Sequence, residues 1–311
     1  MHVDPSVAAA GLLVGFTVGL TGMGGGALMT PILVLLFKVQ PLAAVSSDLV
    51  AAVVMKPVGG GVHLRRGTVN FALVRWLMVG SVPAAFAGVL LLRLLGDGPA
   101  IQARVKEALG VALVLAAASI VVKAALQARG ARGDGPETDR PRADRPPPFH
   151  ARRVPTVLVG VLGGLVVGMT SVGSGSLMIV LLMLLYPALT SAELVGTDLI
   201  QAIPLVASAA FGHLLFGDFK LDLTASLLVG SLPGVYLGAR VSSRARDALI
   251  RPALALILLA SGLKLVALGT TQVALVLAGV VLAAGLYLGL ARRELVAAVV
   301  PARAPFRRPG R

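Results

Sequence analysis

The sequence contains no cysteine among its 311 residues. Disulfide bonds, thiolate metal sites and cysteine nucleophiles are therefore excluded for this chain. Charged residues are also scarce, at 14%, whereas 57% of the residues are hydrophobic and the mean hydropathy is +0.90. About 20 consecutive apolar residues cross the ~30 Å hydrocarbon core of a bilayer. Several uncharged runs approach this length, so the composition predicts an all-α protein that crosses a membrane several times.

Motifs of several enzyme classes are missing as well. There is no His-Glu-x-x-His metal motif and no Walker A lysine loop, so neither zinc proteolysis nor ATP hydrolysis is expected. Residues 173–176 read Gly-Ser-Gly-Ser, which lacks the Gly-x-Ser-Gly spacing of a rhomboid-type serine protease. We therefore expect no enzyme activity, no catalytic residues, and no metal or other cofactor.

Basic residues outnumber acidic residues by 28 to 14, which gives a formal net charge of +14. Most of the arginines lie in loops and tails, where the positive-inside rule places them, so the charge indicates membrane orientation and not nucleic-acid binding. Residues 1–5 include no lysine or arginine, so a cleaved signal peptide is not expected. The expected location is the cell (plasma or inner) membrane.

Two glycine-rich breaks interrupt apolar segments at matching positions. Residues 21–29 read Thr-Gly-Met-Gly-Gly-Gly-Ala-Leu-Met, and residues 170–178 read Thr-Ser-Val-Gly-Ser-Gly-Ser-Leu-Met, 149 residues later. Each glycine costs roughly 1 kcal/mol relative to alanine in a helix interior, so both runs predict helix ends. At membrane depth, irregular backbone is tolerated only where protein buries it or water reaches it. Paired broken helices are the best sequence indication of a transporter binding site.

The second half of the chain repeats the first. Beyond the breaks the offset becomes 150, so that Asp48 corresponds to Asp198 and His63 to His213. Duplication explains this register better than chance similarity between apolar segments. The expected parts are a first membrane repeat (7–126), a polar Arg/Pro-rich linker (127–155), a second membrane repeat (156–268), an extra transmembrane helix (272–290) and a basic tail (291–311). The linker has too few apolar residues to bury a core and is expected to be disordered.

Loop charge distinguishes two topologies. If each broken segment crosses the membrane once, the repeats are parallel. When the linker is then placed inside the cell, the arginines of residues 240–251 and of the tail fall outside. If each broken segment is a re-entrant hairpin, the repeats are inverted, and these arginines lie inside together with Arg65, Arg66 and the linker; Arg93, Arg104 and Lys106 remain outside. Because the positive-inside rule fits it better, we favour the re-entrant, inverted-repeat arrangement.

The helix starts that follow the breaks are candidates for anion binding. A helix N-terminus presents unpaired N–H groups and a partial positive charge, and nearby hydroxyl groups add donors. Close packing of small residues is the alternative explanation of the glycines, and we favour binding. The candidate substrate-binding residues are Thr21, Gly24, Gly25, Gly26, Thr170, Ser171, Gly173, Ser174, Gly175 and Ser176.

Asp48 and Asp198 lie within apolar segments, where a carboxylate is expensive and usually functional. Proton coupling and a structural hydrogen bond to the facing break are the two open interpretations. Lys56 is deep in an apolar run; it either pairs with a substrate anion or Asp48, or snorkels toward Arg65 and Arg66, which we favour slightly.

The histidines His63 and His213 lie at segment ends, which favours structural roles at the membrane interface over proton transfer. Gln201 is a candidate for facing a cavity. The candidate coupling and pathway residues are Asp48, Asp198, Ser47, Thr197, Lys56 and Gln201.

Four stretches resemble the TauE/SafE sulfite-exporter-type permease family. They are Gly-Met-Gly-Gly-Gly at 22–26, the Ser-Asp-Leu and Gly-Thr-Asp-Leu sequences at 47–49 and 196–199, and His-Leu-Arg-Arg-Gly-Thr-Val at 63–69. The resemblance covers nearly all of residues 7–268 and implies a plasma-membrane carrier of small organic or sulfur-containing anions, such as sulfite or sulfonates. The sequence departs from the family's usual Gly-Thr-Ser-Leu, because Asp48 and Asp198 stand where the family often has serine.

We therefore expect a secondary transporter for a small anion, either sulfite or a related organosulfur or small organic anion, with protons as the candidate coupling ion. A passive anion channel or a structural membrane protein is the alternative. The expected partners are the anionic substrate and the lipid bilayer, and no nucleic acid. The sequence carries no indication of transport direction or oligomeric state.

Overall fold

The computed structural model describes residues 3–21, 25–94, 96, 98–133, 151–217, 219–241, 247–266, 268–280 and 282, and contacts divide the chain into the units Met1–Ala267 and Leu268–Arg311. The described residues form helices and no β-strand, as the composition predicts. Six helical segments are long and apolar enough to cross a membrane; they are Pro41–Arg65, Phe71–Leu94, Pro99–Leu126, Arg153–Thr170, Ala192–Phe216 and Leu221–Gly238.

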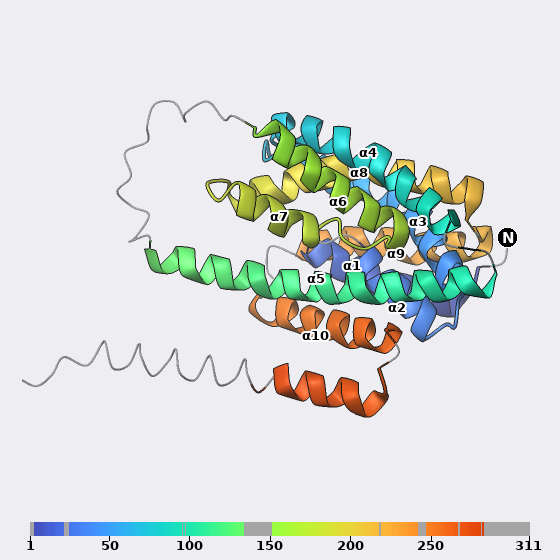
Figure 1. The fold of residues 1–311 in the computed structure, drawn as a ribbon. Coiled ribbons are helices and arrows are strands. Elements are labelled where there is room, and N and C mark those ends of the chain that lie inside the picture. The colour runs from blue at the N-terminus through green and yellow to red at the C-terminus, as the bar shows by residue number, and fades with distance from the viewer. Residues whose placement is uncertain are drawn as a thin grey trace, which may run out of the picture. The chain divides into compact units, whose positions relative to one another are not determined.

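The first half of the chain contains helices α1 to α5 (Figure 1). They are α1 (Pro5–Thr21), α2 (Gly26–Leu35), α3 (Pro41–Arg65), α4 (Phe71–Leu94) and α5 (Pro99–Gly133). The predicted break separates α1 from α2. Helix α5 continues beyond the predicted linker start at residue 127, because residues 124–129 (Ala-Ala-Leu-Gln-Ala-Arg) are strong helix formers.

The second half contains α6 (Arg153–Thr170), α7 (Leu177–Leu185), α8 (Ser191–Phe216), α9 (Leu221–Val241) and α10 (Asp247–Leu265). The second predicted break separates α6 from α7. Helix α8 begins with a capping box, in which Thr190 and Glu193 satisfy each other's backbone N–H groups. The unit at the C-terminal end contains a helix at Thr270–Val280, which begins two residues before the predicted segment 272–290 and overlaps it. Most of the linker (134–150) and the basic tail (291–311) lie outside the described residues.

Helix α7 turns back along α6, and the two lie side by side in Figure 1. The hydroxyl oxygen of Tyr186, directly after α7, accepts the Arg152 N–H at 2.8 Å and lies 2.6 Å from Thr156 Oγ1. Both partners belong to the start of α6. The chain therefore returns, after the break, to the end of the bundle from which α6 began.

The first helix of each half packs along the fourth helix of the other half: α1 along α9, and α6 along α4. A Cβ atom added to Gly15 would overlap Ser231, and one added to Gly164 would overlap Ser81. The glycines are 149 residues apart and the serines 150, so both contacts use the same pair of repeat positions. Glycine is needed here because the two backbones touch.

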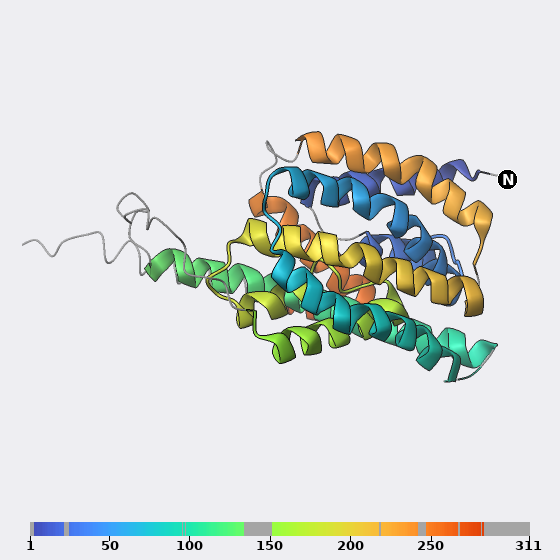
Figure 2. The same cartoon turned by 90° about the horizontal axis from the view of Figure 1, so that it is seen from above.

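Helices α3 and α8 pack against each other in antiparallel directions (Figure 2). Ser46, near the start of α3, lies 2.9 Å from the ring of His213, near the end of α8. At the opposite end, Thr68 follows α3 and touches Gly196, near the start of α8. Helix α3 contributes to two apolar clusters; one contains the fully buried Leu33 and Leu113, and the other contains the fully buried Met178.

Candidate functional site

The second break is a structured turn and not a frayed helix end. Ser171 ends α6 in the left-handed conformation, with its N–H donating to the Val167 carbonyl at 2.7 Å. Gly173 and Gly175 have φ values of 124° and 90°, which side chains on L-residues rarely permit. Thr170 Oγ1 accepts the Val172 N–H at 3.1 Å and so fixes the turn from within.

The two breaks meet. A Cβ atom added to Gly26, the first residue of α2, would overlap the carbonyl oxygen of Ser171. Gly25 is the N-cap residue of α2 and is buried. Thr21 is the last residue of α1, and Gly24 lies outside the described residues. The start of α2 therefore lies against the turn between α6 and α7.

Asp48, on α3, forms hydrogen bonds both to the second break and to α2, the helix that follows the first break. Its Oδ2 atom accepts hydrogen bonds from Ser171 Oγ at 2.6 Å and from Thr30 Oγ1 of α2 at 3.0 Å. The side chain is 2% exposed. A buried carboxylate needs such donors, because an unpaired one costs several kcal/mol.

Lys56 lies two turns after Asp48 on the same face of α3. Its Nζ atom donates to Ser174 Oγ of the second break at 2.7 Å, and its charge interacts with Asp198 and with Asp48. The residue is 8% exposed. The snorkelling interpretation is therefore wrong, because the lysine reaches the centre of the protein and not the side of Arg65 and Arg66.

Asp198 lies on α8 and contacts the same break from the other side. Its carboxylate accepts Gln201 Nε2 at 3.0 Å and the backbone N–H of Gly175. Gln201 in turn accepts Ser81 Oγ of α4 at 3.1 Å. Asp198 and Gln201 are at most 1% exposed, so this chain of hydrogen bonds is buried, and Gln201 is its middle member.

Two of the candidate hydroxyl groups, Ser176 Oγ and Ser47 Oγ, are buried without a hydrogen-bond partner among the described residues. Ser176 is the N-cap residue of α7, yet its side chain makes no capping bond. A buried hydroxyl without a partner is unusual and needs an explanation, such as a ligand. Thr197 is different, because its Oγ1 accepts the Asn70 N–H at 3.0 Å and so holds the start of α4.

The two histidines have structural contacts. His213 is fully buried, and its Nε2 donates to the Gly168 carbonyl at 2.8 Å. His63 Nδ1 lies 2.9 Å from Thr68 Oγ1 in the turn after α3. His213 thus connects α8 to α6 in the interior of the protein and not at its surface.

Sequence reasoning missed Thr30 and Ser81, the partners of Asp48 and Gln201. Thr30 is the one polar residue in the otherwise apolar stretch 27–37, which was a usable signal. Ser81 lies in a Gly-Ser-Val-Pro sequence that corresponds to Gly-Ser-Leu-Pro at 230–233, but this similarity alone does not distinguish a packing serine from a site serine.

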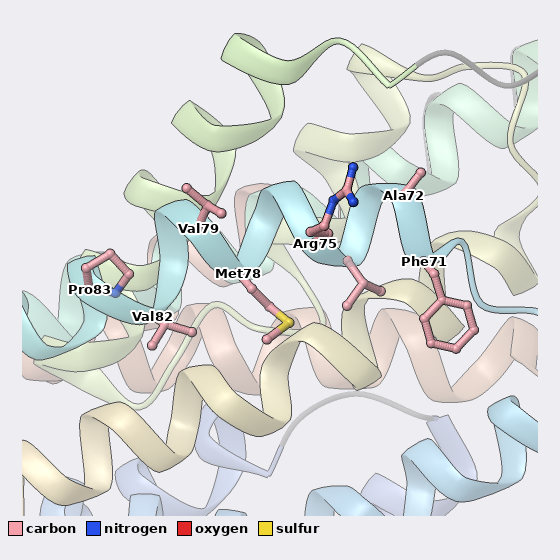
Figure 3. A pocket seen from close by; sticks show the side chains of 8 residues that line it. Phe71, Ala72, Arg75, Met78, Val79, Val82 and Pro83 are labelled. Carbon is pink, nitrogen blue, oxygen red and sulfur yellow. The ribbon is translucent and has the colours of Figure 1, made fainter.

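A groove of about 840 Å³ lies elsewhere, on the outer face of α4 (Figure 3). It contains none of the candidate site residues; its lining is Phe71, Ala72, Val74, Arg75, Met78, Val79, Val82 and Pro83. The groove and the buried cluster are therefore separate features.

Apolar helices around two helix breaks, with buried charges between them, define a multi-pass membrane protein with an internal polar site. Residues 7–265 match the family described as sulfite exporter TauE/SafE, and the chain belongs to this family. It is also similar to the "Probable membrane transporter protein YjnA" of Bacillus subtilis (strain 168), at 38% identity over 265 residues, which are 84% of this chain and 99% of that protein. No solved structure matches the chain. The chain is a membrane transporter.

Proposed function

We propose that this transporter is a secondary carrier that moves a small anion, namely sulfite or a related organosulfur or small organic anion, together with protons. The observation that carries the proposal is the buried Lys56 ammonium group, bonded to Ser174 at the turn before α7. A buried positive charge beside donor groups of a broken helix is suited to a negative ligand.

Several donors surround the place where the anion would bind. Ser176 has a hydroxyl group without a partner among the described residues, directly at the N-terminus of α7. Ser174 could exchange its bond to Lys56 for a bond to the anion. Hydroxyl and ammonium donors match the oxygen atoms of sulfite, sulfonates and carboxylates equally. The family's description as sulfite exporters supports the sulfur-containing members of this group.

Proton coupling follows from the charges around Lys56. One ammonium group faces two buried carboxylates, Asp48 and Asp198. If both carboxylates are ionised, the cluster is already negative, and an additional anion would be buried without compensation, at a cost of several kcal/mol. Binding protons to the carboxylates removes this excess negative charge. Anion and proton would therefore enter the site together.

A carrier fits the burial of the site better than an open channel. Lys56, Asp48 and Asp198 are each at most 8% exposed, so an anion can reach them only when helices move apart. Alternating access provides this movement when two repeats rock around a central site.

The repeat arrangement we propose is inverted. Corresponding helices α3 and α8 run antiparallel, and the contacts of α1 with α9 recur between α6 and α4. A pseudo-two-fold axis in the membrane plane reverses the direction of corresponding helices, whereas parallel repeats preserve it. The return of α7 along α6 supports a re-entrant hairpin in the second repeat.

Counterflow in proteoliposomes tests the transport proposal. Labelled sulfite, sulfate, thiosulfate, methanesulfonate and acetate should be offered in turn to liposomes loaded with the unlabelled anion. A carrier predicts saturable exchange for at least one of them. Flux that rises linearly without saturation would support a channel instead, and no flux above empty liposomes would contradict anion transport.

Cysteine labelling tests the topology, and the cysteine-free chain is a suitable background. Ser6→Cys, Ala188→Cys and, as a linker reference, Thr138→Cys should be treated in intact cells with an impermeant maleimide. Re-entrant hairpins place Ser6 outside and put Ala188 inside with the linker, so only Ser6→Cys should react. Single crossings with the linker inside predict the reverse, with Ala188→Cys labelled and Ser6→Cys protected.

A further inference from the structure

Two arginines lie over the ring of the chain's tryptophan at one end of the bundle. The guanidinium carbon of Arg75 is 5.5 Å from the centre of the Trp76 ring, and that of Arg153 is 5.3 Å from it. Arg75 and Trp76 belong to the first turns of α4, and Arg153 begins α6. Both distances are within the range of cation–π attraction.

The two guanidinium groups lack a negative partner within the part of the chain that the structure describes. Both arginines are exposed, and neither has an ion pair with any described carboxylate. Helix α6 also has no acidic residue in its first turn and no side-chain cap. Its N-terminal amide groups therefore add a partial positive charge to the two arginines.

An apolar groove extends from this basic cluster along α4. It reaches from Phe71 to Pro83, which is about 18 Å along a helix, close to the ~15 Å depth of one hydrocarbon leaflet. In Figure 3, Arg75 and Val79 rise from one side of α4, while Phe71 and Met78 point to the other. These rows of side chains border the groove.

We propose that the groove and the cluster of Arg75, Trp76 and Arg153 form a binding site for an anionic phospholipid. The phosphate of the lipid lies between the two arginines, and one acyl chain occupies the groove along α4. Tryptophan and arginine at the start of a membrane-spanning helix are at the depth of the headgroups, where such a phosphate is found.

A lipid fits these observations better than a soluble anion or a protein partner. Seven of the eight residues that line the groove are uncharged and apolar, and Phe71 and Val79 are more than half exposed. Because α4 is one of the helices long enough to cross the membrane, this face meets acyl chains in a bilayer. A free phosphate ion would use the arginines but leave the groove unexplained.

The experiment uses Trp76 as its own probe, because the chain has one tryptophan. The full-length protein is reconstituted in phosphatidylcholine vesicles that contain equal fractions of brominated phosphatidylglycerol or brominated phosphatidylcholine, whose bromine atoms quench tryptophan fluorescence on contact. Near an anionic surface each arginine gives roughly a fivefold preference for anionic lipid. We therefore expect brominated phosphatidylglycerol to occupy the site at least about fivefold more strongly than brominated phosphatidylcholine.

Two double variants separate this site from general surface charge. Arg75→Gln/Arg153→Gln should abolish the preference for phosphatidylglycerol, whereas Arg65→Gln/Arg66→Gln, which removes two arginines just before α4, should keep it. Soluble glycerol phosphate should not reverse the preference, because it cannot fill the groove. Equal quenching by both lipids in the wild-type protein would overturn the proposal, whatever the variants do. Reversal by glycerol phosphate, or a preference that survives in Arg75→Gln/Arg153→Gln, would overturn it too.

Discussion

Lys56→Met should reduce saturable anion exchange by about ten- to a hundredfold while the protein remains folded. Methionine is unbranched like lysine and one atom shorter, and it removes the charge and the bond to Ser174. A hydrogen bond to a charged group contributes ~1.5–3 kcal/mol, and each 1.4 kcal/mol changes an equilibrium tenfold. The measurement is counterflow in proteoliposomes, with the anion for which the wild-type protein shows saturation.

Two further variants make the Lys56 experiment decisive. Lys106→Met removes an exposed lysine of α5 and should leave exchange unchanged. If Lys56→Met lowers the yield of folded protein, the cause is the pair of carboxylates left without a cation. Lys56→Met/Asp48→Asn should then recover folded protein without recovering exchange. Exchange at the wild-type rate in folded Lys56→Met would show that the lysine does not bind the anion.

Asp198→Asn should keep anion exchange but remove uphill uptake driven by a proton gradient. Asparagine retains the Oδ1 atom that accepts Gln201 Nε2, but it cannot bind and release a proton. Exchange with the anion on both sides needs no net proton movement, so it should survive. In the wild-type protein, uptake should rise when the side of entry is made more acidic, and in Asp198→Asn this dependence should be lost.

The structural interpretation of Asp198 predicts a different pattern. If the carboxylate serves only to hold Gln201 and the turn at Gly175, Asp198→Asn should be mild in every assay. Asp198→Leu should then reduce folded protein, because two buried donors lose their acceptor. Gradient-driven uptake as strong in Asp198→Asn as in the wild type would exclude coupling through this residue.

The helix breaks could be predicted because their cause is local. Glycine disfavours a helix wherever it occurs, and α1, α2, α6 and α7 end and begin within the two glycine-rich stretches. The all-helical class and the long apolar helices follow equally from hydropathy. The start of the linker was less predictable, since helix formers continue α5 into a segment with a polar composition.

The position of Lys56 could not be predicted, because it depends on a distant part of the chain. Snorkelling considers only the distance to the interface along the lysine's own helix. Its partner, Ser174, is 118 residues away in sequence and reaches α3 only through the fold. The same holds for Thr30 and Asp48, which meet because the start of α2 packs against α3. The sequence identified the ionisable residues of the site but not which donor each one meets.

The central claim is that the turn between α6 and α7 binds the transported anion. Hydrogen exchange measured by mass spectrometry tests it directly, using purified protein with and without the anion that gives saturable counterflow. The anion should slow exchange at residues 173–178, where Ser174 and Ser176 would donate to it, and Lys56→Met should lose this protection. Protection confined to other segments, with residues 173–178 unchanged, would contradict the account.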